Sequence, residues 1–224
     1  MSGAFSANWR NVAKVRCEES EITLTYRLAA GARQLEIAIE ANWLQRGGRE
    51  VGTPSLRMRF PLPLTGAKGR YEVPFGWVDR DRNAGEEVPA LRWAHVSGRL
   101  AGGGRCGYTV LNDCKYGHSL DGSTLRVSLL RSSWDPDPLP EMGDHAMRLA
   151  VVPHVGAPTE AELIRLGAAF NHPLTVVATD VHEGDLPAAG PAAAEAAPAG
   201  VLLVAMKKAE DDDAVIFRLL EASG

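Results

Sequence analysis

Polar and apolar residues alternate along most of the chain, which is the pattern of strands that turn one face toward a core. Leu35, Ile37 and Ile39 are separated by polar or small residues, and residues 22–28 alternate in the same way. Gly31 lies between these two runs, so they predict an antiparallel hairpin. Comparable runs complete the predicted strands, which lie at residues 22–28, 34–43, 55–60, 70–74, 91–96, 107–111, 125–130, 147–152 and 214–220.

One stretch, residues 159–169, has the features of a helix instead. Thr159 is followed three residues later by Glu162, the spacing of a capping box, in which each side chain bonds to the backbone N–H of the other residue. Helical patterns are weak before this point. The chain is therefore predicted to be all-β with one short helix.

The spacing of the strands predicts a large antiparallel β-sandwich of roughly ten to twelve strands. We expect the main sandwich in residues 1–170, and C-terminal strands that form a second, small sheet in residues 171–224. Apolar, β-branched runs at residues 174–180 and 201–207 belong to this second part. Residues 186–200 between them are rich in alanine, proline and glycine, a composition that predicts a mobile loop.

A long loop, residues 132–144, separates the two strongest strand patterns. Its three prolines remove backbone donors, so the segment cannot continue a ladder. Loops of this length inside a compact domain are usually functional or disordered. Arg131, Trp134 and His145, within or beside it, favour a functional loop.

Composition and charge exclude several classes of function. The net charge is −4, and the 24 basic and 28 acidic residues are interspersed, so nucleic acid is not an expected partner. No apolar run approaches the roughly 18 residues of a membrane span, and the first residues lack the apolar core of a signal peptide. The three cysteines (Cys17, Cys106 and Cys114) form no C-x-x-C pair, which favours a reduced, cytoplasmic location.

A metal site is not expected in this chain. Asp144 and His145 with the distant His154 are the closest approach to a ligand set, and zinc sites prefer tighter spacing. His154 follows a strand pattern, where a hydrogen-bonded structural histidine is the more usual role.

The long loop carries four carboxylates within ten positions: Asp135, Asp137, Glu141 and Asp144. Two carboxylates about 5–9 Å apart can perform glycosidase chemistry, but spacing on a loop does not define that distance. Asp before Pro forms turns, so a structural role is favoured, and a substrate hydrogen bond from one of these residues is a milder alternative.

Four other residues each have two possible roles. Asn112 and Asp113 follow a strand and either form a local turn or contact substrate. Arg131 ends a strand that points into the long loop, where it could orient a carboxylate or contact sugar hydroxyls. Trp134 could stack on a sugar ring or cover the core.

Several blocks of sequence resemble the C-terminal β-region of glycoside hydrolase family 38 α-mannosidases. The most specific are LNDCKYG at residues 111–117 and the PDP, GDH and PH pieces between residues 136 and 154. The resemblance extends over nearly the whole chain, in blocks at residues 70–80, 89–93, 111–117, 125–131, 136–138, 143–145, 153–154, 170–174, 207–211 and 218–221.

The resemblance implies a fold and a partner. Family members are retaining, zinc-dependent exo-mannosidases whose zinc ligands and Asp nucleophile lie in an N-terminal α/β domain that precedes a helical bundle. None of those motifs is in this sequence, so neither catalytic residues nor metal ligands are expected in this chain, and zinc belongs to the absent catalytic domain. The family's β-region is a supersandwich similar to that of aldose mutarotases.

The resemblance also implies a function for the loops. The β-region of the family packs on the catalytic domain and sends loops toward the rim of the active site. We therefore expect this chain to support an α-mannosidase, to have mannosides as ligands and to be inactive alone. Without its catalytic domain the chain should expose a large apolar patch, so a homo-oligomer is a further expectation. The resemblance assigns no residue-level roles. The predicted substrate-binding residues of the rim are Asn112, Asp113, Arg131, Asp137, Asp144 and His145.

Two other functions remain open from the residues. A free-standing carbohydrate-binding module could use Trp77, Trp93 and Trp134 as stacking platforms. A mutarotase-like epimerase would need a histidine and a glutamate in one cleft, and its candidates are His95 or His145 with Glu72 or Glu87.

Overall fold

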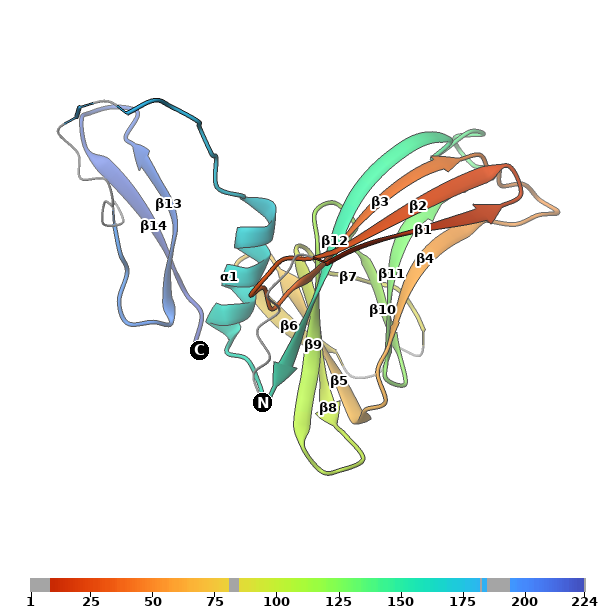
Figure 1. Ribbon diagram of the computed structural model, residues 1–224, viewed down its shortest axis with the longest axis horizontal. Helices are drawn as coiled ribbons and strands as arrows, with labels where there is room; N and C mark the ends of the chain where they lie inside the picture. Colours follow the sequence, from red (N-terminus) through yellow and green to blue (C-terminus); the bar gives the residue numbers. More distant parts are fainter. Residues whose placement is uncertain (1–8, 81–84, 182, 185–193, 224) are drawn as a thin grey trace.

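A computed structural model describes residues 9–80, 85–181, 183–184 and 194–223 of the chain. Two antiparallel sheets form a sandwich, one helix covers its outer face, and a separate hairpin lies beyond the helix (Figure 1). The predicted all-β sandwich is therefore confirmed.

Eight strands form the larger sheet, in the order β1-β2-β3-β12-β9-β8-β5-β6. Its inner face carries the smaller sheet, in the order β4-β11-β10-β7. The strands of the larger sheet are β1 (Trp9–Cys17), β2 (Ser20–Leu28), β3 (Leu35–Trp43), β5 (Thr65–Val73), β6 (Gly76–Arg80), β8 (Trp93–Arg99), β9 (Arg105–Asn112) and β12 (Gly143–Val155). Those of the smaller sheet are β4 (Ser55–Pro61), β7 (Val88–Pro89), β10 (Gly117–Asp121) and β11 (Thr124–Arg131).

The main core lies between the two sheets. Ile37 and Ile39 of β3 are 3% and 1% exposed, and they belong to the same core as Leu125 and Val127 of β11, which are fully buried. Complete burial of one such side chain contributes about 1.5–3 kcal/mol. The alternation seen in the sequence thus selects which face of each strand enters this core.

The helix α1 (Glu160–Asn171) packs on the outer face of the larger sheet and begins with the predicted capping box at Thr159. A second core forms there, where Trp93 is fully buried beneath the helix. Gly167 permits this approach, because a Cβ atom at that position would lie 2.7 Å from Cδ1 of Trp93. No helix in the described part of the chain is long and apolar enough to cross a membrane.

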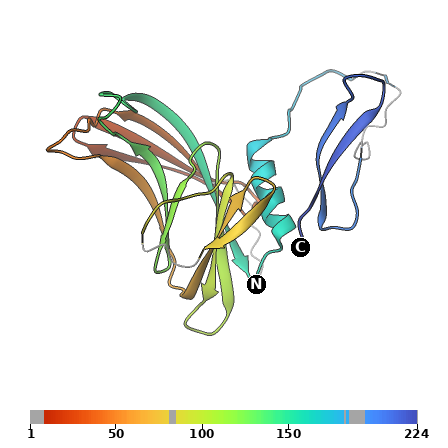
Figure 2. The same ribbon diagram turned by 180° about the vertical axis from the view of Figure 1, so that it is seen from behind.

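The hairpin of β13 (Val201–Lys208) and β14 (Val215–Glu221) forms a sheet of its own. Figure 2 shows it on the far side of α1 from the two larger sheets. Leu202 and Ala222 at its base join the core beneath the helix. The predicted domain boundary after residue 170 falls in the last turn of α1, and the division into two domains stays a prediction.

The expected strand at residues 174–180 is wrong. This segment has no regular secondary structure, no strand pairs with it among the described residues, and Leu174 and Val176 are 94% and 90% exposed. β-branched composition favours an extended backbone, but a strand also needs a neighbour to bond to. Residues 186–193 of the mobile loop expected at 186–200 lie outside the described residues.

Candidate functional site

Asn112 and Asp113 lie at the end of β9, beside the middle of β12. The amide of Asn112 is buried; its Nδ2 donates to the Leu91 carbonyl at 2.7 Å, and its Oδ1 accepts from the Lys115 backbone N–H at 2.9 Å. This is a turn-forming geometry. Asp113 instead reaches Arg148, whose backbone N and Nε donate to its carboxylate at 3.0 and 3.2 Å.

The other predicted site residues lie in or beside the long loop between β11 and β12. Asp137 Oδ1 accepts from the Leu139 backbone N–H at 2.9 Å, and Asp144 Oδ1 accepts from Asn42 Nδ2 at 2.7 Å. Nε2 of His145 donates to the Glu141 carbonyl at 2.7 Å. Arg131 is exposed at the end of β11, with no partner for its guanidinium found in the described residues.

These residues therefore form two sets. Asp113 pairs with Arg148, which is four residues along β12 from Asp144, roughly 13 Å at the rise of a strand. The loop set gathers exposed carboxylates and an arginine, groups that can bond to hydroxyls. The Asn112–Asp113 set is largely engaged with the protein's own backbone and with Arg148.

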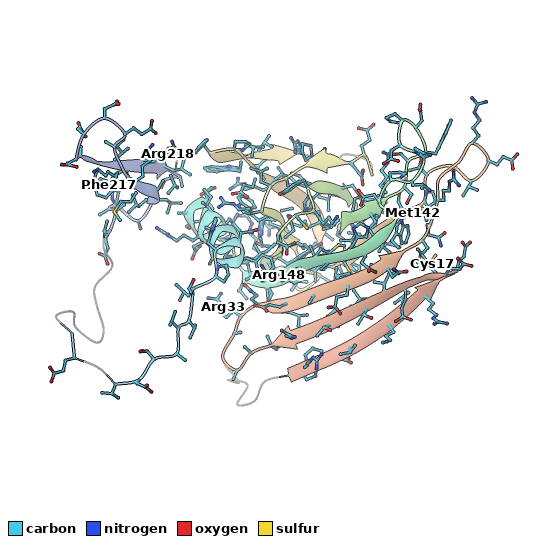
Figure 3. All side chains as sticks on the ribbon, turned by 90° about the horizontal axis from the view of Figure 1, so that it is seen from above. Cys17, Arg33, Met142, Arg148, Phe217 and Arg218 are labelled. Atoms are coloured by element: carbon cyan, nitrogen blue, oxygen red, sulfur yellow. The ribbon has the colours of Figure 1, made fainter. Side chains whose placement is uncertain are left out.

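Three connections meet at the end of the sandwich that carries the loop set. The β3–β4 connection packs so closely on the long loop that a Cβ atom at Gly47 would lie 2.3 Å from the Ser132 carbonyl oxygen. Gln45 Nε2 of the same connection donates to the Cys17 carbonyl in the β1–β2 turn at 3.1 Å. Figure 3 shows Cys17 and Met142 at this end, opposite the hairpin residue Phe217. We call these three connections the loop end.

One buried hydrogen bond anchors the long loop to the core. Nε1 of Trp43, which is 3% exposed, donates to Ser132 Oγ at 2.7 Å. We expect Ser132→Ala to lower the free energy of unfolding by about 1–3 kcal/mol, because the indole N–H is left buried without an acceptor. Urea unfolding measures the change. Ser133→Ala, one position further into the loop, serves as the control, and equal stability of the two variants would contradict the assigned bond.

The tryptophans differ in their suitability for sugar stacking. Trp93 is fully buried and cannot be a stacking platform. Trp77 is partly buried, with the Arg70 guanidinium 5.6 Å from its ring centroid. Trp134 in the long loop is 39% exposed, with Arg49 5.7 Å from its ring. Of the three, only Trp134 at the loop end offers an exposed ring.

Beneath α1 lie two separate sets of ion pairs that the sequence did not predict. Glu72 is 3% exposed, and both of its oxygens accept from the Arg92 guanidinium. Arg70 bridges Asp79 of β6 and Glu160 of the helix. No local signal marks these pairs, because each joins residues from different elements.

Two histidines of the larger sheet, His95 and His154, are bridged by a hydroxyl. Thr109 Oγ1 lies 3.0 Å from His95 Nδ1 and 2.8 Å from His154 Nε2. Burial, aided by the charges of His154 and Arg70, lowers the pKa of His95 to about 3. Burial and the Arg33 charge also lower the pKa of His154, which Glu162 opposes. Both histidines are therefore neutral at pH 7. His154 has the structural role expected for it.

The two histidine candidates for an epimerase, His95 and His145, bond to Thr109 and to the Glu141 carbonyl, and do not support that hypothesis. Glu72 is paired with Arg92, and Glu87 contacts Arg57 and Ser128. None of the proposed histidine–glutamate pairs is in contact in the described part of the chain. The described residues also contain no group of three or more His, Cys, Asp or Glu side chains that could hold a metal ion, so they do not fit a zinc site.

His154 lines a groove of about 950 Å³ between α1 and the ends of β1 to β3. The groove is rich in arginine, and Figure 3 shows Arg33 beside the helix at its wall. Its charged residues are Arg10, Arg27, Arg33, Arg165, Glu36 and Glu162.

Comparison with known proteins gives one consistent result. The family described as "Glycosyl hydrolases family 38 C-terminal domain" matches residues 6–139. The alpha-mannosidases 2C1 of Mus musculus and Homo sapiens are each 33% identical to this chain, over 187 and 185 residues. Each match covers 75% of this chain and 16% of that protein, so the chain spans a small part of the length of these relatives.

A solved structure has the same fold. The crystal structure of an alpha-mannosidase from Enterococcus faecalis V583 matches 89% of this chain and 23% of its own, with a TM-score of 0.68. The sequence identity is 17%, so this match is a likeness of fold alone.

Proposed function

The chain belongs to the family of glycosyl hydrolases family 38 C-terminal domains, and on that premise we propose that it is the accessory β-sandwich of a longer α-mannosidase. The observation that carries the proposal is the match to two alpha-mannosidases. This chain covers only 16% of the length of each. In this proposal the longer protein removes terminal α-D-mannosyl residues, and this chain supports its catalytic domain.

We assign the chemistry to the part of the enzyme outside this chain. Retaining glycosidases use one carboxylate as nucleophile and another as acid and base. Zinc bound there would hold hydroxyls of the sugar. What this chain contributes is a rigid end with polar side chains. A cytoplasmic location is part of the proposal, and three free cysteines are consistent with it.

The loop end is the proposed rim of the sugar site. Arg131, Asp137 and Asp144 present charged groups there, and each carboxylate has one oxygen held by the protein and the other available to a hydroxyl. Bonds to one oxygen orient the group before substrate arrives, which reduces the entropy lost on binding. His145 holds the long loop through the Glu141 carbonyl. Asn112 and Asp113 lie in the other set, and Asp113 is proposed to steady β12, the strand that leaves the rim, through Arg148.

The isolated chain is expected to release no nitrophenol from a nitrophenyl α-mannoside, with or without added Zn²⁺. The physical reason is that neither a zinc ligand set nor a catalytic carboxylate is assigned to it. Metal-dependent turnover above that of buffer, retained through purification, would refute the proposal.

A chimera provides the positive test. The matching segment of Mus musculus alpha-mannosidase 2C1 is replaced by this chain, and hydrolysis of the same substrate is measured beside the mouse protein and a deletion of that segment. We expect the chimera to retain activity that the deletion loses. A chimera that folds and is monodisperse but is as inactive as the deletion would count against the function.

A free-standing carbohydrate-binding module is the second candidate, and the exposed ring of Trp134 is the observation that favours it. Titration with mannose or mannobiose distinguishes the two. Saturable quenching of tryptophan fluorescence that disappears in Trp134→Ala would favour the binding module. No response at millimolar sugar would favour the accessory role.

A further inference from the structure

The strand β1 is the outermost strand of the larger sheet. All nine of its residues pair with β2 along one edge, from Trp9 opposite Leu28 to Cys17 opposite Ser20. Along its other edge, no strand among the described residues pairs with it. Eight of its nine residues are exposed, and Trp9, Val12 and Val15 are 44–47% exposed.

Free edges of this length are normally protected in proteins. Proline, a bulge, a very short strand or charged side chains are the usual devices. β1 contains no proline, and its register with β2 runs without a shift. Its protection is charge alone, from Arg10, Lys14 and Arg16 on one face of the strand. Main-chain donors and acceptors along the edge therefore stay available to a strand of the right charge.

The charges of β1 disfavour antiparallel pairing of this edge with β1 of a second copy of the chain. If two copies paired antiparallel about Ala13, Arg10 would lie opposite Arg16 and Val12 opposite Lys14. Shifting the register by two residues in either direction places Arg10 opposite Lys14, or Lys14 opposite itself. Like charges directly opposite one another are destabilising, and such repulsion is how a surface rejects a wrong partner.

The neighbouring strand β2 shows which chemistry fits. Glu21 lies across the paired edge, 3.3 Å from Lys14 Nζ and 3.5 Å from Arg16 Nη2. At the other end of β1, Arg10 lies opposite Arg27, so two positive charges adjoin. Glu21 thus pairs with two of the three basic residues, and β2 places no carboxylate opposite Arg10.

The excess of positive charge continues into the groove beside α1. Four arginines line that groove, against two glutamates. One of these, Glu162, already bonds to the Thr159 N–H, and the other, Glu36, accepts from Gln34. The free edge and the groove meet at Trp9 and Arg10, so they form one continuous surface with a positive excess.

We propose that the free edge of β1 receives an extended, acidic segment from the catalytic part of the same α-mannosidase. The segment adds a ninth strand to the sheet through main-chain hydrogen bonds, a known mode of recognition. Its carboxylates face Arg10, Lys14 and Arg16, and its end enters the groove. The inference rests on the proposed function, for which it names the docking surface.

The chemistry of the edge is tested on the isolated chain by hydrogen exchange. The probe is a nine-residue peptide in which glutamates alternate with valines and threonines. One control peptide carries lysine in place of glutamate. A second control keeps the glutamates but carries methyl groups on alternate backbone nitrogens, which removes main-chain donors. We expect only the unmethylated glutamate peptide to slow exchange of the amides of Trp9–Cys17, by about tenfold at saturation. Equal protection by the lysine peptide, or none by any peptide, would overturn the inference.

Variants assign the effect to the charges. The triple variant Arg10→Gln/Lys14→Gln/Arg16→Gln should lose most of the protection, and Lys207→Gln/Lys208→Gln on the hairpin should keep it. Solvated ion pairs contribute little stability, so both variants are expected to fold. Retained protection in the β1 variant would contradict the charge argument.

The source of the segment is tested in the mouse chimera. If the catalytic part supplies the strand, amides of Trp9–Cys17 exchange about tenfold more slowly in the chimera than in the isolated chain. Fast exchange of β1 in an active chimera would overturn the inference and leave the proposed function standing. An inactive chimera would count against the function, while the peptide experiment still reports on the edge.

Discussion

Replacement of Arg92 by methionine is expected to lower the free energy of unfolding by about 3–5 kcal/mol. The substitution leaves the Glu72 carboxylate, which is 3% exposed, without its guanidinium partner. Its Oε2 keeps one bond, from the Arg92 backbone N–H at 2.7 Å, so a value near the lower end is expected. Urea unfolding followed by far-ultraviolet circular dichroism measures the loss.

Two further variants isolate the cause of this effect. The double variant Glu72→Met/Arg92→Met removes both charges and should recover much of the loss, since replacement of a buried ion pair by apolar side chains is often neutral. Lys14→Met, which removes an exposed partner of Glu21, should leave the free energy of unfolding nearly unchanged. If Arg92→Met lost as little stability as Lys14→Met, the Glu72 carboxylate would have to be solvated or bonded to another partner in that variant.

Lowering the pH from 8 to 5 is expected to reduce the stability of the chain by about 4 kcal/mol. Burial lowers the pKa of His95 to about 3 and that of His118 to about 4. In the unfolded chain both titrate near 6.5, so below that pH the unfolded state binds more protons than the folded state. Stability therefore falls as the pH drops below 6.5, by about 2 kcal/mol for each histidine at pH 5.

Above pH 7 both histidines are neutral in both states, and this contribution vanishes. His118→Gln should remove about half of the difference between pH 8 and pH 5. Ser133→Ala, which removes no titratable group, serves as a control, and we expect it to keep the full pH dependence. Urea midpoints at the two pH values give the comparison. An unchanged pH dependence in His118→Gln would show that this residue is protonated in the folded chain.

Local pattern was sufficient for most of the elements. The alternation at residues 22–28 and 34–43 predicted the β2–β3 hairpin, because side chains in a strand alternate strictly between two faces. Thr159 and Glu162 predicted the start of α1, because a capping box lies within four residues. β1 was missed: both of its faces are exposed, so no burial imposes a regular alternation on its sequence.

The candidate site depended on contacts that no local pattern contains. Asn112 and Asp144 are both prominent in the sequence, yet the pairing of β9 and β12 places them in separate sets. Trp93 was a candidate platform for sugar stacking because it is a tryptophan. Only the packing of α1 on the sheet showed that its ring is buried.

By itself the sequence determined most of the strands, the single helix and the family. These properties are encoded by residues near one another in the chain. The tertiary structure decided the order of the strands, the pairing of Glu72 with Arg92, and the position of β1 at an open edge of the sheet. The physical reason is that a strand's pattern specifies which face it buries, and its neighbour is chosen by contacts between residues far apart in the sequence.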